Sequence, residues 1–452
     1  MSRPIAGEIA RLAWPVFVAQ IAIMANGVVD TVMAGRYGTL DLAGVGIGAS
    51  VYVMLFITLM GVLFALTPTA AQLHGARRYA AIGEEVRQSA WLAIGLASIS
   101  LVLLTHPGPV IALSRLAPEV EAKVRAYLSF IAWGVPAALL FRVFQSFSTA
   151  VSRPRVVMTL NLVGLALKVP LNWACMYGEL GLPALAGAGC ALATAAIAWI
   201  TCALAWLWCA LDPGYRRYRV FERWSWPQAR AQWQLVALGV PIGATFFVDV
   251  TAFTFMALFI ARFGALWSGA HQIAANLAAL CFMLPLSVGN AASVLVGQAI
   301  GAGELARARA TGATGLVIGL ACGLALGGAI YFAAGPIVRL YTGDPAVQRA
   351  AAVLLAFVAM YHVFDAIQAV AANVVRGYKR AAVPMLIYGV VLWGVGLGGG
   401  YALAIGALDL RVLGVGTPLG APGFWLAAVI GMALAATLMT IYFFRLTRRQ
   451  RA

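Results

Sequence analysis

The stretch GATFFVDVTAFTFMALFIA, residues 243–261, is long and apolar enough to cross a membrane as a helix, yet it contains one carboxylate, Asp249. Two other long apolar runs contain Asp30 and Asp365. An acid in hydrocarbon costs about 2.5–3.5 kcal/mol even on the lenient insertion scale, so acids kept there usually face a wet cavity and handle ions, protons or cationic ligands. The three acids therefore predict a transporter.

The composition of the chain predicts an all-α polytopic membrane protein. Of its 452 residues, 63% are hydrophobic and 10% are charged, and the mean hydropathy is +0.91. A soluble domain is typically about 45–50% apolar and about 25% charged. The apolar runs are continuous rather than alternating, which indicates membrane-spanning helices and not the strands of a barrel.

Hydropathy predicts about twelve membrane spans. The longest polar segment contains an arginine cluster and divides the chain nearly in half. We therefore expect an N-terminal six-helix lobe at 1–210, a cytoplasmic linker at 211–232 and a C-terminal six-helix lobe at 233–452. The predicted spans are roughly residues 10–35, 44–72, 88–106, 122–150, 156–176, 187–209, 233–261, 270–299, 309–332, 349–375, 383–406 and 423–445.

The net charge of +16 comes from basic residues that cluster at the ends of the apolar runs. About two thirds of them fall on the side of the termini and the linker, and the side rich in Lys and Arg is cytoplasmic. We expect both termini inside and the first run to be a retained span, because it has no cleavage site after a short apolar region. No nucleic-acid motif accompanies the charge, so we expect no nucleic-acid partner.

The two halves of the chain repeat each other. Each half has an even number of predicted spans, so both run the same way through the membrane, which is the parallel-repeat layout of alternating-access carriers with a central cavity. The three acids have no acidic counterpart in the other half. Selection for function would produce such a difference, and drift after duplication is the alternative. The matched pairs are Pro15/Pro241, Arg36/Arg262, Gly38/Gly264, Gln72/Gln298, Gly75/Gly301, Phe141/Phe364, Gln145/Gln368 and Arg153/Arg376; Asp30, Asp249 and Asp365 stand opposite Met256, Ile23 and Arg142.

Two of the acids share a helix face with other polar side chains. Asp30 follows Asn26 by four residues, and this face suits a proton, Na⁺ or a drug cation. Asp365 has Tyr361 four residues before it and Gln368 three after it, which suits a hard monovalent cation or a protonatable acid. The alternative for each is a structural acid paired with a nearby base.

Three further charges lie inside predicted spans. Asp249 belongs to the same half as Asp365, and two acids close together in a low dielectric form either a proton site or a cation site. Lys168 lies in the middle of the fifth span, where a buried lysine requires an acid partner unless its side chain extends to the interface. Arg142 lies near Gln145 and is more consistent with a structural role.

Other polar and aromatic side chains in the spans are secondary candidates. The polar ones are more often contacts between helices than ligands, and the aromatic ones are more often packing residues than the lining of a cavity. The polar set is Asn161, Asn172, His271, Gln272 and Asn276, and the aromatic set is Phe246, Phe247, Phe253, Phe255 and Trp133.

Several kinds of site are not indicated by the sequence. The six cysteines and four histidines show no metal-ligand spacing, so we expect no metal beyond Na⁺ at Asp249 and Asp365, and no disulfide. No phosphate loop and no G-x-S-x-G motif occurs, so we expect no enzymatic activity and no cofactor other than a coupling Na⁺ or H⁺.

The chain resembles the multidrug and toxic compound extrusion (MATE) family in its NorM-like branch, over almost its whole length. The stretches that carry the resemblance are NGVVDTVMAGRYG (26–38), VPLNWACMYGELGLPALAGAGCALAT (169–194), FFVDVTAFTFMALFIARFGALWSGAHQIAANL (246–277), FDAIQAVAANVVRGYK (364–379) and PLGAPGFWLA (418–427).

The resemblance implies a drug/cation antiporter of the bacterial inner membrane that expels amphipathic, often cationic compounds in exchange for Na⁺ or H⁺. Its pattern assigns the coupling ion to Asp30, Asp249, Asp365 and Tyr361. Asn172 matches a polar residue of the N-terminal lobe. We expect the protein to act as a monomer in contact with lipid.

The sequence departs from the family pattern at two positions. Asp249 replaces the usual glutamate, and Lys168 stands where related members often carry asparagine. An ammonium at 168 would neutralise Asp30, which favours coupling by H⁺ or through the C-terminal lobe alone. Three alternatives remain: a lipid-linked oligosaccharide flippase of the same superfamily, a non-transporting membrane scaffold, and a channel, although no pore-ring sequence is visible.

Overall fold

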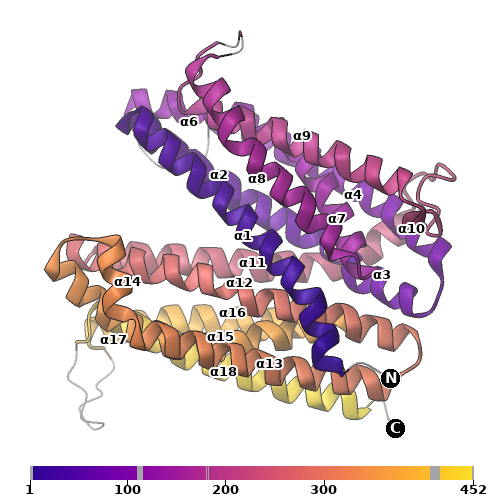
Figure 1. Ribbon diagram of the computed structural model, residues 1–452. Helices are drawn as coiled ribbons and strands as arrows, with labels where there is room; N and C mark the ends of the chain where they lie inside the picture. Colours follow the sequence, from indigo (N-terminus) through magenta and orange to yellow (C-terminus); the bar gives the residue numbers. More distant parts are fainter. Residues whose placement is uncertain (1–3, 109–115, 180, 182, 408–417, 450–452) are drawn as a thin grey trace. The chain divides into compact units, whose positions relative to one another are not determined.

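The computed structural model describes residues 4–108, 116–179, 181, 183–407 and 418–449. Of the stretches quoted above, only residues 180 and 182 lie outside this part. The helices, labelled as in Figure 1, are α1 (Ile5–Tyr37), α2 (Thr39–Leu63), α3 (Leu66–Gly75), α4 (Tyr79–Thr105), α6 (Pro118–Ala132), α7 (Val135–Ala150), α8 (Pro154–Tyr177), α9 (Ala188–Leu211), α10 (Pro213–Arg216), α11 (Ala229–Ala261), α12 (Ala265–Gly301), α13 (Leu305–Phe332), α14 (Ala334–Tyr341), α15 (Pro345–Gly377), α16 (Ala382–Gly389), the π-helix η1 (Val390–Gly398), α17 (Gly399–Ile405) and α18 (Ala421–Arg449).

The all-α fold and the span count predicted from the sequence are confirmed. Among the described residues, 11 helical segments are long and apolar enough to cross a membrane, and the bent pair α6–α7 raises the total to 12. The axes of α6 and α7 differ by 48°. This bend lies at Trp133–Gly134, just before Pro136, whose ring cannot donate a backbone hydrogen bond and disrupts a continuing helix.

By its contacts the chain divides into two compact units, one made of Met1–Phe17 and Ala244–Ala452 and the other of Val18–Gly243. We call them the C-terminal unit and the N-terminal unit. The boundaries lie inside α1 and α11, so each of these helices begins in one unit and ends in the other. Each boundary follows a proline of the sequence repeat, Pro15 or Pro241, by two residues. A proline weakens a helix locally because one backbone hydrogen bond is missing.

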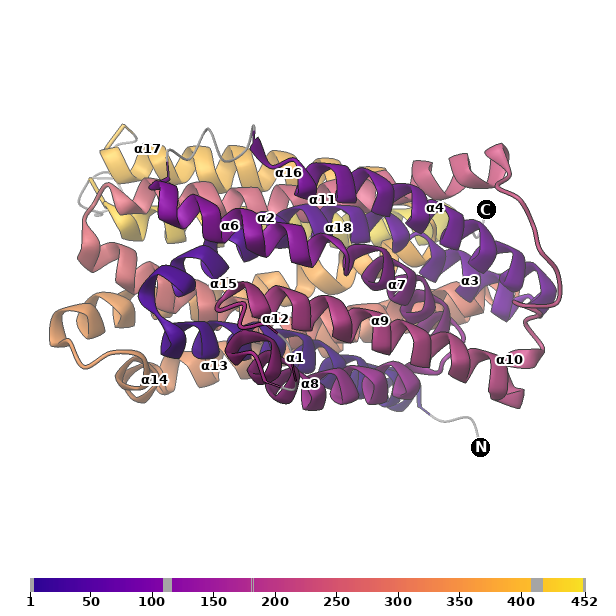
Figure 2. The same cartoon turned by 90° about the horizontal axis from the view of Figure 1, so that it is seen from above.

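In the N-terminal unit the long helices run roughly parallel or antiparallel to one another (Figures 1 and 2), and the main packing pairs are α8 with α9, α2 with α6 and α4 with α7. Glycines allow close approach, as at Gly189 of α9, where a Cβ would lie 2.6 Å from the backbone of Cys175 on α8. Helix α8 ends at Gly178, whose φ of 79° is the left-handed conformation typical of a helix C-cap.

In the C-terminal unit α15 is the central helix, packed against α12, α13 and α18. Helix α13 faces it with glycines at every fourth residue, so that small side chains line one face and the two backbones approach closely. A Cβ at Gly327 would lie 2.5 Å from the Ala359 carbonyl oxygen of α15. The glycines of this face are Gly315, Gly319, Gly323 and Gly327.

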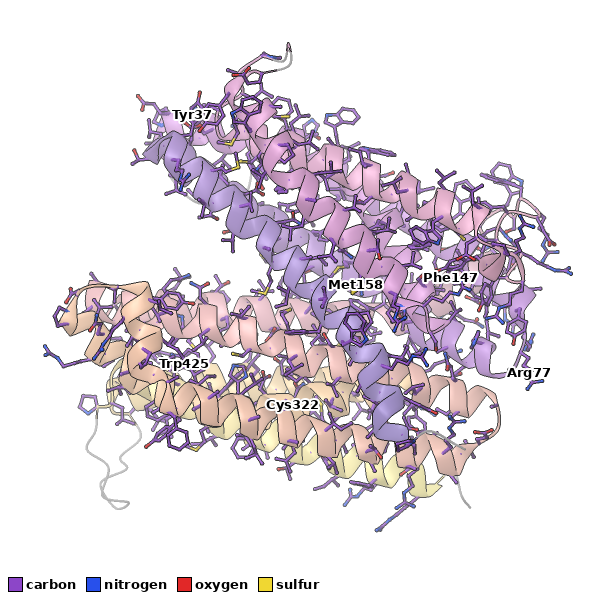
Figure 3. The ribbon with its side chains drawn as sticks, in the orientation of Figure 1. Tyr37, Arg77, Phe147, Met158, Cys322 and Trp425 are labelled. Carbon is purple, nitrogen blue, oxygen red and sulfur yellow. The ribbon has the colours of Figure 1, made fainter. Side chains whose placement is uncertain are left out.

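The segment between α9 and α11 is fastened to the N-terminal unit. Arg87 of α4 donates to the backbone carbonyls of Arg219 and Val220, and Phe147 of α7 (Figure 3) packs its ring against Tyr215 and Tyr218. Asp212 caps the short helix α10. Burial opposes its ionisation, but the Gly214 N–H and the Arg153 guanidinium hold the pKa of Asp212 below its usual value.

Two adjacent glycines of α13 should respond oppositely to alanine. Gly327→Ala places a methyl group against the α15 backbone and should lower the midpoint of thermal unfolding, because backbone atoms cannot yield cheaply. Gly328 has open space at the Cβ position, so Gly328→Ala should raise the midpoint through a helix-propensity gain of about 0.5–1 kcal/mol. Unfolding of the detergent-solubilised variants measures both effects. Equal shifts for the two variants would contradict the close α13–α15 contact.

Candidate functional site

Asp30 of α1 lies against two side chains of α8. The Lys168 Nζ is 2.8 Å from Asp30 Oδ1, and the Asn172 amide donates to the same oxygen at 2.7 Å. Lys168 also donates to the Thr194 hydroxyl of α9. Lys168 and Asn172 are four residues apart on α8 and therefore project from one face of the helix.

This cluster is a buried ion pair with its charges matched inside the protein. The side chain of Lys168 is 1% exposed and that of Asp30 is 13% exposed. Removing an ammonium from water is costly unless an anion compensates it, so the position of Lys168 depends on Asp30 being ionised. The buried Oδ1 atoms of Asn26 and Asn172 have no hydrogen-bond partner within the described part of the chain.

The other two acids lie together in the C-terminal unit, on α11 and α15. The Tyr388 hydroxyl of α16 donates to Asp249 Oδ1 at 2.6 Å. The Asp365 Oδ2 is 3.6 Å from the His362 Nδ1, too far for a hydrogen bond. The two carboxylates interact electrostatically with each other and with the phenol groups of Tyr361 and Tyr388. We call these four residues the acidic cluster.

The carboxylates of the two units differ in their basic partners. Within the described residues, neither Asp249 nor Asp365 has a lysine or arginine nitrogen within 4.0 Å, whereas Asp30 has Lys168. Asp365 is 3% exposed, and the His362 imidazole 3.6 Å away has no hydrogen-bond partner at either ring nitrogen among the described residues. The negative charge of the two carboxylates is therefore not balanced by a lysine or arginine of the described residues, and a proton or a monovalent cation can balance it.

Aromatic rings surround the acidic cluster on one side. Trp425 of α18, labelled in Figure 3, packs edge-on to Tyr361 at 6.0 Å between ring centroids and also contacts Phe253 and His271. Phe253 and Tyr361 are 6.4 Å apart. These rings fix the orientation of the phenol and exclude water from that side.

Tyr388 is the next-to-last residue of α16, just before the helix changes from α to π. Helix α16 ends at Gly389, and the π-helical segment η1 begins at Val390. π-helical turns are rare and occur frequently at functional sites. Here the change of helix type begins two residues after Tyr388, which donates to Asp249.

The remaining predicted residues have varied surroundings. Gln368 is buried and donates to the Met439 sulfur at 3.7 Å. Phe246 lies 5.6 Å from the Arg376 guanidinium, whereas Phe247 is 40% exposed. Asn276 is on an exposed face of α12. Within the described residues no group of three or more His, Cys, Asp or Glu is arranged to hold a metal ion.

Three site residues were not identified from the sequence: His362, Tyr388 and Thr194. His362 had a signal, because it precedes Asp365 by three residues and must share its helix face. Tyr388 and Thr194 had none, because each meets its acid or lysine only through packing between helices. Tertiary contacts of this kind leave no pattern in a single sequence.

Comparisons with known proteins agree with this architecture. The sequence profile of the MatE family matches residues 15–174 and 241–402. The chain is 43% identical over 436 residues to a probable multidrug resistance protein NorM of Aromatoleum aromaticum, covering 96% of this chain and 93% of that protein. It is 36% identical over 443 residues to the multidrug resistance protein PmpM of Pseudomonas aeruginosa, covering 98% and 92%.

Solved structures share the fold at low sequence identity. The eukaryotic MATE transporter AtDTX14 superposes with a TM-score of 0.86 at 18% identity, covering 99% of this chain and 98% of that one. An outward-facing multidrug resistance MATE family transporter of the MOP superfamily superposes with a TM-score of 0.89 at 16% identity, covering 99% and 97%.

The Lys168–Asp30 pair should behave as a unit in unfolding experiments. Lys168→Met leaves a buried carboxylate uncompensated and should cost about 3–5 kcal/mol. The double variant Asp30→Asn/Lys168→Met removes both charges and should recover most of that loss. Arg125→Met, which breaks the exposed pair with Glu121, is the control and should cost about 1 kcal/mol or less.

A double-mutant cycle on the purified protein measures the coupling between the two positions. Additive losses in the double variant would show that the observed contact contributes no net interaction.

Proposed function

The chain belongs to the MatE family, and from that premise we propose that it is a secondary active multidrug efflux transporter. It exports amphipathic, often cationic compounds in exchange for Na⁺ or H⁺ by alternating access. The observation that carries this proposal is the pair of membrane-depth carboxylates in the acidic cluster. Among the described residues, no lysine or arginine nitrogen lies within 4.0 Å of either carboxylate. Such a site binds either the coupling cation or a cationic substrate.

The coupling follows from competition for the acidic cluster. When the site faces outward, Asp249 and Asp365 take up Na⁺ or a proton, and the gain of positive charge weakens the binding of a cationic drug, which leaves. After the transporter turns inward, the coupling ion dissociates and a new drug binds. Competition for one set of carboxylates is sufficient to link the two fluxes. One charge moved through 100 mV supplies about 2.3 kcal/mol.

The Lys168–Asp30 pair supports assigning the coupling ion to the C-terminal unit. Its ammonium already neutralises the carboxylate from 2.8 Å, so an additional cation there would be repelled. The same pair is an argument against a flippase for pyrophosphate-linked lipids, since Lys168 is not free to attract an anion. A flippase of this kind would need other basic residues to bind the pyrophosphate group.

The proposed location is the bacterial inner membrane, with both termini and the 211–232 linker in the cytoplasm. The long apolar helices support a multi-pass arrangement. The excess of Lys and Arg on the side of the termini supports the orientation. We propose a monomer as the functional form.

Ethidium efflux from inverted vesicles or loaded cells tests the proposal. We expect efflux under a Na⁺ gradient, a pH gradient or both, applied separately at constant membrane potential. Efflux under Na⁺ alone identifies a sodium antiporter, and efflux under the pH gradient alone identifies a proton antiporter. An absence of efflux under both gradients would contradict the proposal for this dye.

Neutralising both acids of the cluster should uncouple transport. Asp249→Asn/Asp365→Asn should reduce gradient-driven ethidium efflux to the background of empty vesicles, because neither coupling ion has a carboxylate left. Glu222→Gln, which alters an exposed linker pair with Arg219, is the control and should transport as the unchanged protein does. Retained ion-driven efflux in the double variant would refute the assignment to this cluster.

A further inference from the structure

Arg142 of α7 is a charged residue at membrane depth that the proposed mechanism does not use. Its Cζ lies 3.6 Å above the ring centroid of Phe64, and its Nη1 donates to Gln145 Oε1 at 3.0 Å. The Arg142 Nε is buried and has no hydrogen-bond partner among the described residues. No carboxylate lies within 4.0 Å of this guanidinium anywhere in the described part of the chain.

A guanidinium in this state is electrostatically incomplete. Arginine stays ionised in proteins, and taking its charge out of water is costly unless an anion or several acceptors compensate it. Lys168 meets this requirement with Asp30, whereas the buried Arg376 of α15 has, like Arg142, an amide oxygen and an aromatic ring. At Arg142 the protein supplies one amide oxygen and one aromatic face.

A second unpartnered polar atom lies one turn further along the same helix. Within the part of the chain that the structure describes, the buried Ser146 hydroxyl has no hydrogen-bond partner, and it follows Arg142 by four residues, so the two share a face of α7. The Arg142 side chain as a whole is only half-buried, which leaves part of it accessible at the surface of the N-terminal unit. A guanidinium fork and a hydroxyl on one helix face are donors of the kind that the two oxygens of a carboxylate accept from.

In the sequence repeat, Arg142 occupies the position that Asp365 has in the other half. Phe141, Arg142 and Gln145 correspond to Phe364, Asp365 and Gln368, so the flanking phenylalanine and glutamine are kept while the charge is reversed. Asp365 belongs to the acidic cluster that we assign to cations. Its counterpart in the other half has the complementary charge on the same scaffold.

We propose that Arg142, with Gln145, Ser146 and the Phe64 ring, forms a site for the carboxylate group of an amphipathic organic compound. The guanidinium binds the carboxylate in a two-pronged contact, and the Phe64 ring holds the guanidinium plane in place by stacking. The transporter therefore binds zwitterionic compounds better than their esters. This inference rests on the proposed efflux function and specifies the substrate class that the N-terminal unit recognises.

Two dyes that differ at a single group test the inference. Rhodamine 110 has a free carboxylate, and rhodamine 123 is its methyl ester, so their ring systems and amines are the same. Fluorescence polarisation with the purified protein gives both affinities. The unchanged protein should prefer rhodamine 110, and Arg142→Gln should weaken rhodamine 110 binding by about tenfold or more while leaving rhodamine 123 within about twofold.

Two further variants control for structural effects. Arg142→Lys keeps the charge but loses the planar fork and should restore part of the preference. Arg216→Gln makes the same substitution at an exposed linker position and should leave both affinities unchanged. Equal weakening of both dyes by Arg142→Gln would show a structural role and overturn the inference.

A measurement on the unchanged protein keeps the test valid even if the Arg142 variants do not fold. Equal affinity for the two dyes, or a preference for the ester, would overturn the inference directly. Gradient-driven efflux of rhodamine 123 by the same preparation tests the transporter proposal separately, because this dye has no carboxylate. Efflux without a preference for rhodamine 110 would thus refute the Arg142 site and leave the transporter proposal standing.

Discussion

A charge placed inside an apolar helix must be compensated, and this requirement organises both units of the protein. The N-terminal unit meets it at Asp30 with a resident cation, the Lys168 ammonium at 2.8 Å. In the C-terminal unit, Asp249 accepts a hydrogen bond from a phenol. Asp365 has an imidazole 3.6 Å away, which makes no hydrogen bond within the described part of the chain. A phenol supplies no full charge, so among the described residues these two acids lack the resident cation that Asp30 has. The two units thus differ in how completely they compensate their buried acids within the described part of the chain.

The packing of each unit keeps these charges in position. In the C-terminal unit the glycine face of α13 brings its backbone against α15, the helix that carries both Tyr361 and Asp365. In the N-terminal unit Gly189 brings α9 against α8, so that Thr194 reaches Lys168. Close backbone contact leaves little freedom for the helices to shift within a unit. Change of shape is therefore expected where α1 and α11 pass from one unit to the other, next to Pro15 and Pro241.

The sequence predicts the features that depend on apolar length or regular spacing, namely the membrane spans and the residues that share a helix face. Apolar length predicts the spans, and the spacing of Asp365 from Tyr361 predicts their common face. Pro136 is a local signal for the break at Trp133–Gly134, whereas no residue pattern marks the π-helical segment that begins at Val390. Partners such as Tyr388 for Asp249 come from helices more than a hundred residues apart. Those contacts depend on how helices meet, which one sequence does not encode in any short pattern.

Duplication explains why the two units have the same framework and different chemistry. A repeated half presents equivalent backbone positions twice, and a substitution in one copy leaves the other intact. At the position shared by Asp365 and Arg142 the neighbouring phenylalanine and glutamine remain, so the framework tolerated both signs of charge. At Asp30 the other half has Met256, and no second acid had to be retained there. The described residues therefore contain a paired acid, two acids without a lysine or arginine partner, and a guanidinium without a carboxylate partner, three electrostatic environments on one repeated scaffold.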